Sequence, residues 1–151
     1  MPNLKERLDA ELKDAMRARN ELLTSVLRML KSAIKYKEVE PGAAALDDSA
    51  IIQLIVTLIK QRRDSVEQFT QGGRPELAAK EEQEIKMLQT YLPQQLGAEQ
   101  LKAEVTAAIA TAQAKSPKDM GAVMKALLPK VQGKAEGKTI SEEVKRQLSL
   151  L

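Results

Sequence analysis

"YLPQQLGAEQ", residues 91–100, interrupts a chain that otherwise shows the apolar spacing of helices. Pro93 ends a helix here, because proline has no backbone N–H and disfavours helical backbone in the residue before it. Gly97 stands just ahead of the next helical pattern. Beyond it the composition becomes rich in alanine and lysine. We therefore predict an N-terminal domain over 1–93 and a C-terminal domain over 97–151.

Four helices are predicted before this boundary, since apolar residues recur there three and four positions apart. Asn3 and Glu6 have the spacing of a capping box ahead of the first helix. Asp47 or Asp48 caps the third helix, and Pro75 stands where the fourth begins. The predicted breaks between these helices are Pro41-Gly42 and Gly72-Gly73, and Arg19-Asn20 either breaks or merely bends the chain between the first two helices.

Three helices are predicted after the boundary. The fifth follows Gly97, and Ser116-Pro117 opens the sixth with a serine cap and a proline at the first helical position. Thr139 and Glu142 are predicted to cap the last helix as a capping box. No segment alternates as a strand does. The sequence therefore predicts an all-α fold, with about four helices in the N-terminal domain and three in a small C-terminal domain.

The composition restricts the chemistry that this chain can perform. Of the 151 residues, 43% are hydrophobic and 30% charged, which indicates a globular protein. Cysteine and histidine are both missing, so the best nucleophile, the usual general base and the usual zinc ligands are absent. The aromatic residues are only Tyr36, Phe69 and Tyr91, too few to form a platform on which bases stack.

The cellular compartment is predicted from the same composition. No apolar stretch approaches the length needed to span a bilayer, so we expect no membrane association. The N-terminal residues "MPNLKERLDAELKDAM" are charged throughout, unlike a secretory signal peptide. These features lead to the expectation of a cytoplasmic protein.

Charge is distributed unevenly along the chain. The net charge is +3 overall, but residues 1–40 carry +2, residues 41–92 carry −2 and residues 93–151 carry +3. Within residues 115–138 there are six lysines against two acidic residues. A local positive field of this kind recruits polyanions.

Two groups of residues are candidate centres of chemistry. Glu81 and Glu84 lie three apart on one helix face, as in helical carboxylate metal sites. Without histidine partners, a solvated face paired with neighbouring lysines is the favoured interpretation. Ser32 lies between Lys31 and Lys35, a spacing that arises by chance on exposed helices. We predict no catalytic residue, no metal and no cofactor.

"LLPKVQGKAEGKTIS", residues 127–141, is the least generic segment. Its glycines allow backbone N–H groups to approach a ligand, and the following helix start adds partial positive charge. No strand precedes it and it lacks the P-loop pattern. The alternative is that the glycines simply end one helix and turn the chain toward the next. The candidate nucleic-acid-binding residues are Lys130, Gly133, Lys134, Gly137 and Lys138.

Three segments carry a family resemblance. They are "SVLRMLKSAIKYKEVE" (25–40), "LIKQRRDSVEQFTQGGRPELAAKEEQEIKMLQTYLPQQL" (58–96) and "DMGAVMKALLPKVQGKAEGKTISEEVKRQL" (119–148). Together they resemble the GatB/YqeY family from end to end, in particular its free-standing YqeY-like members.

This resemblance implies an all-helical, two-part fold whose C-terminal half is similar to the tail domain of the tRNA amidotransferase B subunit. In that enzyme the tail domain contacts the outer corner of tRNA, so the resemblance implies RNA contact through Lys134 and Lys138. The family often has Gly-Arg-Ala-Asp-Gly where this chain has Gly-Lys-Ala-Glu-Gly, residues 133–137. Lys134 and Glu136 keep the charge signs of the arginine and aspartate in the family pattern. The two-pronged hydrogen bonding of an arginine guanidinium is lost.

The function expected from the sequence is therefore a non-catalytic helical module that contacts the tRNA backbone. The alternative is a protein-interaction adaptor that docks on an enzyme of aminoacyl-tRNA synthesis through the apolar faces of the N-terminal half. Carbon–nitrogen ligase activity, with glutamine as amido donor, would be implied for this chain only by its resemblance to the full amidotransferase. No residue here is suited to the amide-forming step.

Overall fold

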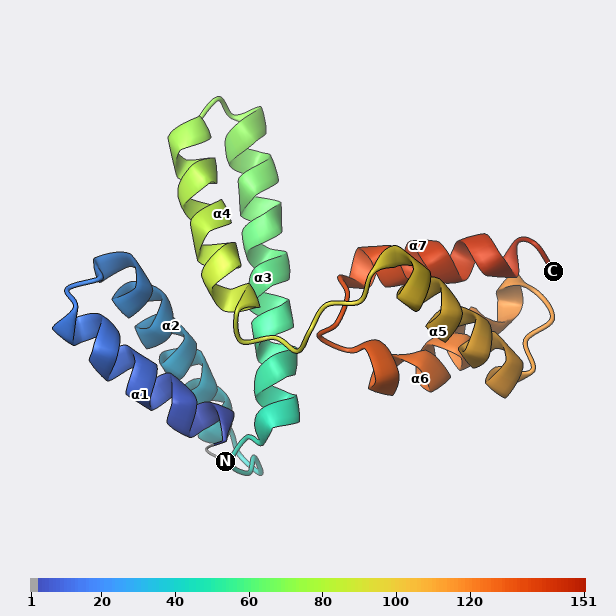
Figure 1. The fold of residues 1–151 in the computed structure, drawn as a ribbon, viewed down its shortest axis with the longest axis horizontal. Helices are drawn as coiled ribbons and strands as arrows, with labels where there is room; N and C mark the ends of the chain where they lie inside the picture. The colour runs from blue at the N-terminus through green and yellow to red at the C-terminus, as the bar shows by residue number, and fades with distance from the viewer. Residues whose placement is uncertain (1–2) are drawn as a thin grey trace. The chain divides into compact units, whose positions relative to one another are not determined.

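The computed structural model describes residues 3–151, and the regular elements in this range are all helices (Figure 1). They are α1 (Leu4–Arg17), α2 (Glu21–Glu38), α3 (Asp48–Gln71), α4 (Pro75–Gln89), α5 (Ala98–Ala112), the 3₁₀ turn η1 (Pro117–Asp119), α6 (Met120–Val131) and α7 (Gly137–Leu148). The all-α prediction is confirmed. Across the described residues, no helix combines the length and the apolar character that crossing a bilayer requires. The contacts divide the chain into unit 1, which ends at Leu92, and unit 2, Pro93–Leu151.

Unit 1 consists of two helical hairpins, α1–α2 and α3–α4 (Figure 1). Helix α2 contacts both α3 and α4, and α1 contacts α3, so the hairpins share one core. The most deeply buried side chains of this core are Leu8, Leu27, Leu30, Ile51, Ile55 and Leu88. Each contributes roughly 2 kcal/mol of transfer free energy when removed from water.

Local sequence signals determine where the helices of unit 1 begin. The Asn3 side chain accepts a hydrogen bond from the Glu6 N–H at 2.8 Å, and the Glu6 carboxylate accepts from the Asn3 N–H at 3.3 Å. The predicted capping box is therefore present. Asp47 is the N-cap of α3, while the Asp48 carboxylate accepts from the Leu4 N–H at 2.9 Å. Adjacent aspartates thus serve two different helix N-termini.

A largely buried ion pair joins the helices of unit 1. Arg62 on α3 donates from Nε to Glu84 Oε2 on α4 at 3.1 Å, and the two side chains are only 15% and 14% exposed. Arg62 also donates from Nη1 to the Leu58 carbonyl at 3.3 Å, and its Nη2 lies 3.5 Å from the Met29 sulfur on α2. The basic run of α3 therefore directs one arginine into the protein.

Unit 2 is a three-helix arrangement in which α5 contacts both α6 and α7 (Figure 1). Its core consists of the buried residues Leu101, Val105, Ala108, Val123, Leu127, Val131, Ile140, Val144 and Leu148. Ser116 is the N-cap of η1, which continues directly into α6, so the predicted start at Ser116-Pro117 is confirmed.

Candidate nucleic-acid interface

The turn between α6 and α7 begins with a glycine that the backbone conformation requires. Helix α6 ends at Val131, and Gly133 is buried with a φ of +76°. That left-handed conformation strains residues with a Cβ atom. The Lys134 N–H donates to the Val131 carbonyl at 2.8 Å and closes the end of the helix. Gly133 therefore terminates α6, which is what the helix-connection interpretation predicts.

Gly137 has a different role, and here one prediction is wrong. Helix α7 begins at Gly137 with Glu136 as its N-cap, so Thr139 and Glu142 do not form the predicted capping box. The Ile140 N–H already donates to the Glu136 carbonyl at 3.0 Å, which places Thr139 inside the first helical turn. Burial of Ile140 in the core of unit 2 favours helical backbone through this turn. A Cβ on Gly137 would meet nothing within 4 Å, so packing does not require glycine there.

The start of α7 leaves backbone donors available. No side chain accepts a hydrogen bond at its N-cap. The first N–H groups of a helix have no acceptor within the helix, and together with the helix dipole they favour anions.

Three lysines surround this helix start in sequence. Lys130 lies in the last turn of α6, Lys138 lies in the first turn of α7, and both are exposed. Lys134 lies in the turn and is half-buried. Within residues 3–151, none of the three is in an ion pair with a carboxylate. The five residues predicted as a nucleic-acid contact therefore lie on one short segment that combines lysine charge with an uncapped helix.

Sequence reasoning missed the segment that contacts this turn. The Leu96 N–H donates to the Lys134 carbonyl at 2.8 Å, and Gln95 donates from Nε2 to the Gly133 carbonyl at 2.7 Å. The partners are 38 residues apart in sequence. No local signal marks a glutamine after a proline as the partner of a distant glycine, so the pairing is visible only in the tertiary structure.

A polar network on the far part of α7 ties it to α5. Gln147 donates to the Lys102 carbonyl at 3.0 Å and accepts from the Thr106 hydroxyl at 2.9 Å. Glu143 accepts hydrogen bonds from Arg146, at 2.9 Å from Nε, and from Gln147 at 3.0 Å. These bonds lower the pKa of Glu143 to about 2, with Arg146 the larger cause. The network stabilises unit 2 and is not a candidate catalytic site.

The acidic pair on α4 has a structural role. Glu84 is bound to Arg62, and burial, followed by the charge of Glu84, raises the pKa of Glu81. Among the described residues, no three acidic side chains gather closely enough to hold a metal ion. The prediction that this pair is not a metal site rested on pairing with neighbouring lysines, whereas the observed partner of Glu84 is an arginine on another helix.

Ser32 lies beside a shallow hollow of about 440 Å³ between α1 and α2, with Leu8 and Ile34 among the residues that line it. The Lys31 ammonium next to it lies 2.6 Å from the Asp9 carboxylate. This ion pair engages the Lys31 side chain with Asp9. The hollow therefore offers Ser32 no activating group from Lys31.

The fold and this turn define an all-helical protein of two units with a basic C-terminal unit. The sequence profile of the family described as Yqey-like protein matches residues 5–148, so the chain belongs to that family. This confirms the resemblance to free-standing YqeY-like proteins.

Curated relatives come from yeasts and carry the name "Altered inheritance of mitochondria protein 41, mitochondrial". The protein of Vanderwaltozyma polyspora is 39% identical over 85 residues, 56% of this chain and 46% of the relative. The protein of Lachancea thermotolerans is 40% identical over 87 residues, 58% of this chain and 46% of the relative. The chain thus spans about half the length of the curated relatives that it matches.

The prediction of a cytoplasmic protein is wrong by this comparison, because the relatives are named as mitochondrial proteins. The prediction rested on a charged N-terminal stretch and a lack of long apolar runs. Those features argue against a secretory signal and a membrane span, but they do not distinguish the cytosol from the mitochondrion.

Proposed function

We propose that this chain is a non-catalytic helical module that contacts the phosphate backbone of tRNA through unit 2. The proposal rests on one observation: the start of α7, which no side chain caps, lies on the same segment as Lys130, Lys134 and Lys138. Within the described part of the chain, none of these lysines is in an ion pair. Residues 93–151 hold nine basic and six acidic side chains, so the field around unit 2 attracts a polyanion.

The contact is to phosphates and shape, with no reading of bases. Tyr36, Phe69 and Tyr91 all precede Pro93, so unit 2 has no aromatic ring on which a base can stack. Lysine ammonium groups act as point charges and lack the fork that arginine presents to a base edge. Binding of this kind is weak, sensitive to salt and largely independent of sequence.

The same features support a role without catalysis. Amide formation needs an activated acyl group, an ammonia source and a suitably placed base or nucleophile. The chain has neither cysteine nor histidine. We therefore propose that any carbon–nitrogen ligase chemistry associated with this family belongs to a partner enzyme.

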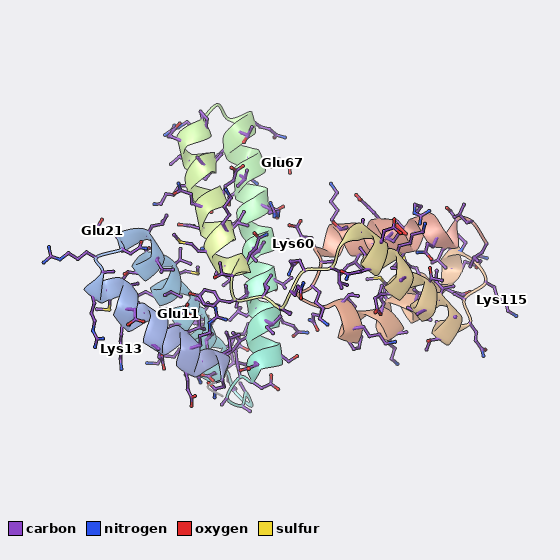
Figure 2. All side chains as sticks on the ribbon, in the orientation of Figure 1. Glu11, Lys13, Glu21, Lys60, Glu67 and Lys115 are labelled. Carbon is purple, nitrogen blue, oxygen red and sulfur yellow. The ribbon has the colours of Figure 1, made fainter. Side chains whose placement is uncertain are left out.

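Binding of tRNA measured against salt concentration tests the proposal. The variant Lys134→Ala/Lys138→Ala removes two phosphate contacts, so its plot of log K against log salt is expected to be shallower by about 2 than that of the wild type. The matched control is Lys13→Ala/Lys60→Ala, which removes the same charge from exposed positions on α1 and α3 (Figure 2). The control is expected to keep the wild-type slope. Failure of the wild type to bind tRNA at low salt, or equal slopes for the two variants, would refute the proposal.

A second candidate is favoured by one feature of unit 1. Tyr36 and Val39, near the end of α2, are 73% and 68% exposed and lie three residues apart. They share a face, and exposed aromatic residues are enriched at protein interfaces. The second candidate function is an adaptor that docks on an enzyme of aminoacyl-tRNA synthesis through this face. The variant Tyr36→Ser/Val39→Ser would then fail to capture that enzyme in an affinity experiment, while its binding of tRNA stays unchanged. Capture that returns no reproducible enzyme of this class would contradict the adaptor.

A further inference from the structure

The segment through which the chain enters unit 2, residues 93–97, lies against the turn between α6 and α7. We propose that this segment is a strap that sets the conformation of the turn, and that Gln95 and Leu96 are positioning residues for the binding of RNA phosphate. The role in binding rests on the proposed function, whereas the mechanical role of the strap is tested without RNA.

The strap supplies two donors to two consecutive acceptors. Gln95 Nε2 lies 2.7 Å from the Gly133 carbonyl oxygen, and the Leu96 N–H lies 2.8 Å from the Lys134 carbonyl oxygen. Gly133 is buried, so an unpaired carbonyl there would cost stability. The strap therefore satisfies two carbonyl acceptors of the turn that follows α6.

The strap is itself held in place by further contacts. Gln95 Nε2 also donates to the Pro93 carbonyl at 3.0 Å, which folds the side chain back over its own segment. The Leu96 side chain packs against the core of unit 2. The Gly97 N–H donates to Gln100 Oε1 at 3.0 Å and fixes the strap to the start of α5. The C-terminal end of the strap is therefore fixed to unit 2, and a fixed segment can impose a conformation on its partner.

The hydrogen bonds from the strap also make the turn electrostatically more favourable for an anion. Carbonyl oxygens carry partial negative charge, and two unpaired ones beside Lys134 would oppose a phosphate. Because the strap's donors occupy the oxygens of Gly133 and Lys134, the lysine charges and the first N–H groups of α7 act with less opposition. Gln95 and Leu96 thus favour phosphate binding without touching the phosphate.

The coupling between strap and turn is reciprocal. If a closed strap raises the affinity of the turn for RNA, bound RNA must lower the equilibrium constant for strap opening by the same factor. The Leu96 amide reports that opening, because its hydrogen bond to Lys134 breaks when the strap leaves the turn.

Hydrogen exchange of the full chain, observed at the Leu96 amide, tests the mechanical part. Gln95→Ala removes the hydrogen bonds from Gln95 Nε2 to the Gly133 and Pro93 carbonyls and is expected to speed exchange at Leu96 about fivefold. The matched control is Gln94→Ala, because Gln94 is the same residue type one position away, is exposed, and makes no hydrogen bond within the described residues. Equal exchange at Leu96 in the two variants would overturn the strap.

Binding of unfractionated tRNA tests the role in recognition. Gln95→Ala is expected to bind about threefold to fivefold more weakly with an unchanged salt slope, since no phosphate contact is lost. Saturating tRNA is expected to slow exchange of Leu96 in the wild type. A shallower slope in Gln95→Ala would make Gln95 a direct contact and refute the positioning role. If the wild type does not bind tRNA, the proposed function and the role in recognition fail together, while faster exchange in Gln95→Ala would still establish the strap.

Discussion

The two units use their charged residues differently. Residues 1–92 hold fifteen basic and fifteen acidic side chains, and several pairs of opposite charge link neighbouring helices. Lys5–Glu38 joins α1 to α2 at 2.6 Å, and Arg62–Glu84 joins α3 to α4 at 3.1 Å. Unit 2 has an excess of lysines around the start of α7, and within residues 3–151 Lys130, Lys134 and Lys138 are in no ion pair. Part of the charge of unit 1 therefore links its own helices, whereas these lysines of unit 2 link none.

The two glycine turns show the same contrast. Gly73 between α3 and α4 and Gly133 between α6 and α7 both have positive φ, at 71° and 76°. Gly73 is exposed, and a Cβ there would meet nothing within 4 Å. Gly133 is buried, and its carbonyl is bonded to Gln95. The hydrogen bonds of the two turns differ, because the Arg74 N–H donates to the Phe69 carbonyl five residues back, whereas the Lys134 N–H donates to the Val131 carbonyl three residues back. Of the two turns, the second is the one that a distant segment contacts within the described residues.

The largest expected loss of stability comes from a substitution that tests whether the two units unfold separately. Leu127 on α6 is fully buried in unit 2, and Leu127→Ala is expected to lower the free energy of unfolding of that unit by about 3 kcal/mol. Both tyrosines, the exposed Tyr36 and the buried Tyr91, lie in unit 1, so tyrosine fluorescence follows this unit and its change on unfolding comes mainly from Tyr91, while far-ultraviolet circular dichroism follows both units. In urea, the dichroism transition is expected to split while the Tyr91 transition keeps its midpoint.

The control for this experiment is the neighbouring Leu128→Ala. Leu128 is 40% exposed, so the truncation leaves little cavity and is expected to cost less than about 1 kcal/mol. A parallel shift of the Tyr91 transition in Leu127→Ala would show one cooperative molecule and would remove the basis for treating the units separately.

An intermediate loss of stability is expected when the largely buried ion pair of unit 1 is broken. Arg62→Met leaves the Glu84 carboxylate largely buried without its partner, and we expect a loss of about 2 kcal/mol in urea unfolding followed by Tyr91 fluorescence. The double variant Arg62→Met/Glu84→Met is expected to recover most of this loss, because both charges are gone.

The exposed pair Arg74–Glu76 is the matched control for the buried pair. Its atoms are 3.2 Å apart, but both side chains are more than half exposed. Arg74→Met is therefore expected to change stability by about 0.5 kcal/mol or less. Equal effects of the two arginine substitutions would contradict an internal role for the charges of unit 1.

The smallest effect concerns the pH dependence of unit 2. Arg146 and Gln147 lower the pKa of Glu143 from its ordinary 4.5 to about 2. A lowered pKa in the folded protein gives stability that is present above the ordinary value and is lost as the pH falls from 4.5 toward 2. The gain is expected to be less than about 1 kcal/mol, because Arg146 is exposed.

The variant Glu143→Gln isolates this contribution. It is expected to be less stable than the wild type at pH 7, and the difference is expected to vanish by about pH 2 in dichroism-monitored unfolding. Glu142→Gln, at an exposed neighbouring position, is expected to leave the pH profile unchanged. A difference that persists at pH 2 would show that the amide substitution perturbs packing and not charge.

The sequence could predict the ends of helices wherever one residue and its near neighbours decide them. Asn3 with Glu6, Asp47 and Ser116 cap helices through their side chains, and Gly73 ends α3 through its positive φ. The prediction failed at α7, because Thr139 with Glu142 satisfies the same local pattern one turn too late. Burial of Ile140 there competes with the cap, and core packing decides the start of the helix.

The features of the candidate site also fall into two groups, those that local sequence determines and those that tertiary contacts determine. The sequence by itself determined the helical class, the glycine that ends α6 and the lysine excess of the C-terminal half, because these follow from spacing, backbone freedom and charge within a few residues. Only the tertiary structure decided that Arg62 is internal, that α7 begins uncapped at Gly137, and that Gln95 and Leu96 bond to Gly133 and Lys134. Those features join residues far apart in the chain, and hydrogen bonds of that kind leave no periodic signal in a single sequence.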